Sequence, residues 1–78
     1  MEVNKIEIVP GLRYMVTIVG PGGTERAVYE GLDPIVCKGA RDGYLTANGV
    51  FAVAVYAKPP GGEWVLGAWF ATHQLPSV

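Results

Sequence analysis

The sequence predicts an all-β domain, an antiparallel meander of five or six strands that curls into a small barrel. Two observations support this fold class. Proline or glycine stands at the junctions between apolar segments, and no segment carries the long 3.6-residue apolar period of an amphipathic helix. Each apolar segment has the length of a strand, so neighbours in the sequence are expected to pair as hairpins.

Three strands are expected in the first part of the chain. Their bounds are residues 2–9, 12–19 and 24–31. A Pro-Gly pair ends the first strand, and Gly20–Gly23 allows a tight reversal after the second because glycine adopts positive φ angles readily. If Val19 pairs with Thr24, Arg13 lies opposite Glu30, and this charge pairing supports the register.

The segment from Leu32 to Asp42 interrupts the strand pattern. Asp33 followed by proline is typical of a helix N-cap and first helical residue, and Gly39 is typical of a helix end. The sequence therefore predicts at most one short helical turn near residues 33–38. A connecting strand over residues 35–37 is the alternative.

Three more strands are expected after this segment. Their bounds are residues 44–47, 50–57 and 64–73. Asn48–Gly49 is the strongest two-residue hairpin signal in the chain, and Pro59–Gly62 makes the last reversal. If Ala57 lies opposite Trp64, one face of the last hairpin carries the larger core residues and the other carries small residues around Trp69.

The small-residue face of these strands needs an explanation, since a strand covered on only one side should alternate apolar and polar residues. The candidate interface or ligand residues on and near it are Leu45, Ala52, Ala54, Tyr56, Gly67, Trp69 and His73. Three explanations are open: another segment of the chain covers the face, a second copy covers it, or a planar ligand stacks on Trp69.

The composition indicates a single domain, residues 1–78, with a marginal core, so a homo-oligomer is expected. Cys37 is the single cysteine, which excludes an internal disulfide, and one Cys with one His excludes a zinc site made of these residues alone. No metal or cofactor is predicted. A net charge of −1 with dispersed Lys and Arg makes nucleic-acid binding unfavourable. Since no apolar run reaches about 18 residues, no membrane span is predicted, and a cytoplasmic location is expected.

The residues that could carry chemistry are few. Cys37 and His73 are the one candidate pair of nucleophile and base, and no motif places them together, so no catalytic residue is assigned and a non-enzymatic role is favoured. The charged residues of the interrupting segment form a candidate partner-binding loop: Asp33, Lys38, Arg41 and Asp42. Helix capping and turn formation explain the two aspartates without any ligand.

In strand number and size the expected barrel is similar to SH3-like and oligonucleotide-binding (OB-like) barrels, a likeness of fold that implies no function. The leading hypothesis is an interaction module that self-associates through the Ala/Gly/Trp69 face and presents the loop to a protein partner. One alternative is an oligomer, or an enzyme, that binds a small molecule between subunits. A barrel that binds single-stranded nucleic acid is a further alternative that the charge disfavours. Bacterial and phage accessory proteins often have this size.

Overall fold

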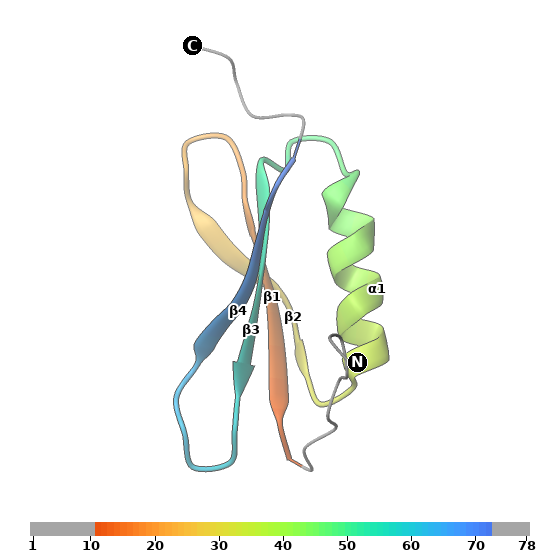
Figure 1. Cartoon of the computed structure of the whole chain (residues 1–78). Helices are drawn as coiled ribbons and strands as arrows, with labels where there is room; N and C mark the ends of the chain where they lie inside the picture. Colours follow the sequence, from red (N-terminus) through yellow and green to blue (C-terminus); the bar gives the residue numbers. More distant parts are fainter. Residues whose placement is uncertain (1–10, 73–78) are drawn as a thin grey trace, which may run out of the picture.

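The computed structural model describes residues 11–72, which form a four-stranded antiparallel sheet with an α-helix on one face (Figure 1). The elements follow the order β-β-α-β-β. They are β1 (Arg13–Val19), β2 (Glu25–Gly31), α1 (Pro34–Leu45), β3 (Ala52–Lys58) and β4 (Val65–Ala71). The strand order in space is β2-β1-β3-β4, so the two hairpins meet where β1 pairs with β3.

This architecture corrects the predicted fold class. Within residues 11–72 the sheet is open, with β2 and β4 at its edges, and the domain is mixed α/β rather than an all-β barrel. The likeness to SH3-like and OB-like barrels was therefore wrong. The predicted strand at residues 2–9 and the candidate residue His73 lie outside the described residues.

Helix α1 begins as the sequence predicted but continues much further. The backbone N–H groups of Ile35 and Val36 donate to the Asp33 carboxylate at 2.9 Å and 3.4 Å, and Pro34 occupies the first helical turn. This is the expected N-cap, which satisfies amides that a helix start leaves unpaired. The prediction of a single turn near residues 33–38 was wrong, because the helix has 12 residues.

The end of α1 corrects two further predictions. The helix passes through Gly39 and ends at Leu45, and the backbone N–H of the C-cap residue Thr46 donates to Gly43 O at 3.4 Å. Residues 44–47 are thus the last turn and cap of a helix and not a strand. Asn48–Gly49 does not join two strands; it connects the helix to β3, and the positive φ of Gly49, 81°, serves that connection.

Two of the predicted hairpins are present, β1–β2 and β3–β4, with altered registers. Val19 lies opposite Glu25 rather than Thr24, and Ala57 lies opposite Val65 rather than Trp64. Each pairing also contains a β-bulge, between β1 and β2 and between β3 and β4. A bulge places two residues against one and reverses the faces beyond it, which a strict two-residue alternation cannot predict.

The core lies between α1 and the sheet, where the helix packs against β1, β2 and β3. Its buried cluster consists of Val16, Ile18, Cys37, Val50 and Val53. The largest fully buried side chains are valines, at positions 16 and 53. No bulky aromatic residue is fully buried among the described residues, so the core formed by residues 11–72 is small.

Candidate functional site

The face of the sheet that points away from α1 is the first candidate site. Because directly paired residues share a face, the registers define it as three rows that cross all four strands. From β2 to β4 the rows are Ala27, Thr17, Ala54 and Trp69; Glu25, Val19, Ala52 and Ala71; and Glu30, Met15, Tyr56 and Leu66. We call these twelve residues the open face. Most of its side chains are apolar, although the face lies opposite the layer formed by α1.

The exposed apolar area of the open face lies toward β4. Trp69 is 53% exposed and Leu66 is 52% exposed, whereas Ala52 and Ala54 retain only 3% and 1% of their surface. The two alanines therefore offer almost no surface to a partner. The tryptophan and leucine, and not a flat floor of small residues, form the contact surface that a partner would meet.

The structure brings together part of the predicted residue set. Ala52, Ala54, Tyr56 and Trp69 share the open face, and Gly67 stands at the bulge of β4 beside it. Leu45 does not belong to this group, because it is the last residue of α1 and packs against the core. Strict alternation along β4 from Phe70 would place Leu66 on the face toward α1, and the bulge beside Val55 and Tyr56 moves it to the open face.

A polar cluster lies on the β2 side of the open face. Glu25 Oε2 accepts a hydrogen bond from Thr17 Oγ1 at 2.5 Å and another from Tyr56 Oη at 2.7 Å. The bond from Thr17, and after it the bond from Tyr56, lowers the pKa of Glu25, because both stabilise the carboxylate. The bond to Glu25, more than partial burial, raises the pKa of Tyr56. The cluster therefore holds Glu25 charged and Tyr56 neutral near pH 7.

An ion pair completes the polar margin of the sheet. Arg13 Nη2 lies 3.2 Å from Glu30 Oε2, so the predicted charge pairing is confirmed even though Glu30 lies opposite Met15. Both side chains are nearly half exposed, so the pair contributes little to stability. It does neutralise two charges at the edge of the open face.

The four charged residues predicted to form a partner loop lie in or next to α1. Asp33 is the N-cap, and Arg41 Nη2 lies 2.7 Å from Asp42 Oδ1, one residue further along the chain. The Arg41 guanidinium carbon also lies 5.4 Å from the centre of the Phe70 ring, in a cation–π contact with β4. Lys38 is exposed on the helix. The segment is thus a helix with local ion pairing rather than a displayed loop.

Cys37 has a structural environment. It is 4% exposed and belongs to the core cluster between α1 and the sheet. Burial raises the pKa of the Cys37 thiol, and the nearby Arg41 only partly opposes this shift. A thiol that stays protonated is a poor nucleophile. Cys37 therefore serves the packing of the core between α1 and the sheet.

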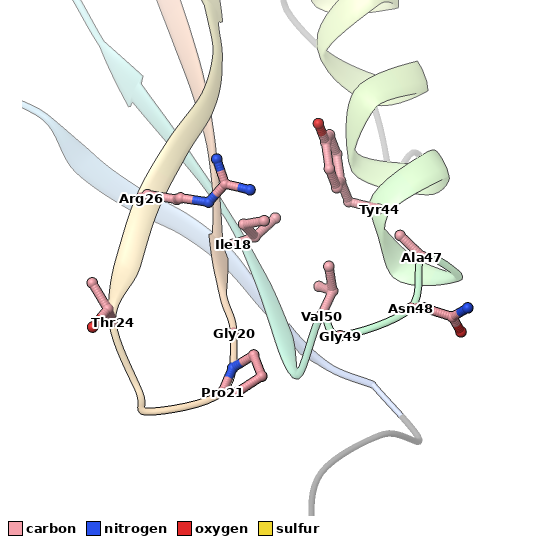
Figure 2. A pocket seen from close by; sticks show the side chains of 10 residues that line it. All are labelled: Ile18, Gly20, Pro21, Thr24, Arg26, Tyr44, Ala47, Asn48, Gly49 and Val50. Atoms are coloured by element: carbon pink, nitrogen blue, oxygen red, sulfur yellow. The ribbon is translucent and has the colours of Figure 1, made fainter.

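The second candidate site is a cavity of about 320 Å³ at the C-terminal end of α1. It opens between the β1–β2 turn, the last helical turn and the connection to β3 (Figure 2). Its lining residues are Ile18, Gly20, Pro21, Thr24, Arg26, Tyr44, Ala47, Asn48, Gly49 and Val50. Sequence reasoning missed this site because its walls come from three segments that only the tertiary fold brings together.

A smaller cavity of about 230 Å³ lies at the other end of the helix, beside Cys37 and Arg41. Among residues 11–72, no group of three or more His, Cys, Asp or Glu side chains is arranged to hold a metal ion. Over the same residues, no helix is both long enough and apolar enough to cross a membrane. These observations leave the open face and the larger cavity as the sites to explain.

No protein-family model, curated protein or solved structure matches this chain. Its function therefore has to be argued from the open face and the cavity themselves. The two sites lie on opposite sides of the sheet, one facing away from α1 and the other between the sheet and α1. Each can accordingly be tested without disturbing the other.

Proposed function

We propose that this protein is a non-catalytic interaction module that assembles with a second copy of itself through the open face. The observation that carries the proposal is the half-exposed Trp69 next to Leu66 on a sheet face opposite α1. Contiguous exposed apolar residues on a small domain mark an interaction surface. Tryptophan is also among the residues that contribute most to the stability of protein interfaces.

The small core of the single chain supports self-association. Within residues 11–72 the largest fully buried side chains are two valines, and a domain of 78 residues buries only about 60% of the surface of its unfolded chain. A second copy packed on the open face would bury Trp69 and Leu66 and add a second apolar layer. Oligomerisation is a common way for domains of this size to gain stability.

The charges of the open face favour a second copy over a strongly charged partner. Arg13 is paired with Glu30, and Glu25 accepts hydrogen bonds from Thr17 and Tyr56 within the same chain. Glu25 is then the one charge among the twelve open-face residues without an ion-pair partner within residues 11–72, and a single carboxylate is too weak a field to select a strongly basic protein. A two-fold axis would place the same apolar patch of one copy against that of the other, with the charged residues at the margin.

The size of the face sets the expected affinity. Four strands of seven residues, about 4.8 Å apart and about 3.3 Å long per residue, give a flat area of roughly 400 to 450 Å². Two copies would then bury roughly 900 Å², close to the lower limit of specific interfaces at about 1,000 Å². We therefore expect a reversible dimer whose population depends on concentration.

Sedimentation velocity over a range of concentrations tests this proposal, with lysine substitutions on the open face. Trp69→Lys and Leu66→Lys alter the apolar patch on β4, and Ala27→Lys alters the same face on β2, away from β4. Ile35→Lys is the matched control, because Ile35 is an 80% exposed apolar residue on α1. All four variants add one positive charge.

The proposal predicts that the wild type and Ile35→Lys form dimers while the three open-face variants sediment as monomers. If Ala27→Lys stays dimeric while the β4 variants dissociate, the copies pair through the edge of β4 and the face-to-face arrangement is wrong. A wild type that stays monomeric at every concentration overturns self-association altogether. A circular dichroism spectrum of each variant shows that dissociation is not unfolding.

A further inference from the structure

The cavity at the end of α1 has a distinctive charge pattern. Of its ten lining residues, Arg26 is the one that carries a charge. Its side chain extends from β2 past Ile18 toward the helix, in the direction of Tyr44 on α1 (Figure 2). The ion pairs within residues 11–72 join Arg13 to Glu30 and Arg41 to Asp42, so Arg26 has no carboxylate partner there.

The floor of the cavity is apolar and firmly packed. Ile18 and Val50 are 5% and 3% exposed and belong to the core cluster. Tyr44 and Ala47 of the helix end pack against the same cluster. A molecule in the cavity would therefore contact the apolar side chains of Ile18 and Val50 on one side and the Arg26 guanidinium on another.

The walls of the cavity are held in place by the fold. Phe51 N donates to Val19 O at 2.7 Å, which fixes the start of β3 against the end of β1. At Gly20 the two connecting segments approach so closely that a Cβ atom would lie 3.3 Å from Gly49 O. The cavity thus exists before any molecule binds, as is usual for small-molecule sites.

We propose that this cavity binds a small organic carboxylate with an apolar body. The planar guanidinium of Arg26 can donate two parallel hydrogen bonds to a carboxylate, while Ile18 and Val50 receive the apolar part. A doubly charged phosphate group fits less well, since no second cation and no helix N-terminus lines the cavity. A volume of about 320 Å³ admits a compound of about ten non-hydrogen atoms.

The helix end determines the orientation of the bound molecule. The C-terminus of a helix carries a partial negative charge and repels anions. The carboxylate is therefore expected at the β2 side, next to Arg26, with the apolar body toward Tyr44 and Ala47. Asn48 lies at the rim on that far side, and its side chain points away from the cavity (Figure 2).

Nuclear magnetic resonance titration with phenylacetate tests the proposal, with the uncharged phenylacetamide as the matched ligand. The amide has the same shape and lacks the negative charge. Arg26→Gln removes the guanidinium at an exposed position where folding should be unaffected, and Arg13→Gln is the control for loss of an arginine elsewhere on the sheet. Amide spectra of each variant report both binding and folding.

We expect saturable shifts around Ile18, Tyr44 and Val50 with phenylacetate and binding at least about tenfold weaker for phenylacetamide. Arg26→Gln should weaken phenylacetate binding at least about tenfold, the usual scale for a hydrogen bond to a charged group, and Arg13→Gln should not. Equal binding of acid and amide, unchanged binding by Arg26→Gln, shifts that map to the open face, or no saturable shift at millimolar phenylacetate would each overturn the proposal. None of these results bears on dimerisation.

Discussion

Tyr56 and Glu25, 31 residues apart in the sequence, are joined by a 2.7 Å hydrogen bond that crosses β1. Tyr56 belongs to β3 and Glu25 to β2, and the two strands are separated by β1 in the sheet. The same carboxylate oxygen accepts the hydroxyl of Thr17 on β1. A single acidic side chain therefore connects the two hairpins on the open face.

The hydrogen bond from Tyr56 should contribute measurably to stability. Tyr56→Phe removes its donor while Thr17 keeps Glu25 partly satisfied, so we expect the free energy of unfolding to fall by about 1 kcal/mol. Urea denaturation measures the change. Tyr14→Phe is the matched control, because the Tyr14 hydroxyl makes no hydrogen bond within residues 11–72. Equal losses in both variants would mean that the bond to Glu25 contributes nothing.

The hydrogen bonds of Glu25 also predict how the stability of the protein depends on pH. The two hydrogen bonds lower the pKa of Glu25 in the folded state from its ordinary value near 4.5. Its contribution to stability is therefore complete above about pH 4.5 and is lost as pH falls through the lowered folded pKa. Thermal denaturation of the wild type and Glu25→Gln between neutral and acidic pH checks this.

The expected result is that the stability gap between wild type and Glu25→Gln narrows as the solution becomes acidic. Glu63→Gln, in the β3–β4 connection, controls for the loss of a carboxylate without these hydrogen bonds. A gap that is constant with pH would contradict the assigned role of Glu25. At alkaline pH the raised pKa of Tyr56 predicts that its contribution is lost as pH rises through that raised value.

The N-cap of α1 makes a separate prediction. Asp33→Ala leaves the amides of Ile35 and Val36 without their side-chain acceptor, which should lower the free energy of unfolding by about 1 kcal/mol. Asp42→Ala removes an exposed aspartate that forms an ion pair with its neighbour Arg41. Because such a pair contributes little, we expect this variant to lower the free energy of unfolding by less than Asp33→Ala does. Chemical denaturation of both variants ranks them. A larger effect for Asp42 would argue against the observed cap.

Two glycines inside α1 allow a test of the helix itself. Gly39 and Gly43 lie within Pro34–Leu45, and a Cβ atom at either position would meet no atom within 4 Å. Alanine is favoured over glycine in a helix by roughly 1 kcal/mol, so Gly39→Ala and Gly43→Ala should each raise stability and helical content. Circular dichroism and thermal denaturation measure both. If the segment were a loop or strand, helical content would not rise.

The hairpins and the face pattern could be predicted because they depend on local residues. A two-residue alternation assigns Ala54, Tyr56 and Trp69 to one face whatever covers that face. The Asp33 cap and the pairing of Arg13 with Glu30 were likewise visible as short patterns, and the structure confirms both. Nothing local indicated that β1 would pair with β3, since that contact joins distant segments.

The helix was missed because its own sequence favours it only weakly. Gly39 and Gly43 lower helix propensity, and the apolar positions that pack on the core are limited to a few residues such as Cys37, Ala40 and Tyr44. These three residues are spaced by three and four positions, as in a helix, but three apolar positions are too few to indicate a helix of this length. Packing against the sheet supplies the stability that propensity lacks. The cavity could not be predicted, because its walls meet only after this packing.

The most direct test of the central claim is an isotope-filtered NMR measurement on a mixture of labelled and unlabelled chains, which detects contacts between copies. If the open faces meet, the indole protons of Trp69 in one copy should contact the side chains of Met15 or Leu66 in the other. The absence of any contact between copies, or contacts confined to α1, would contradict self-association through the open face.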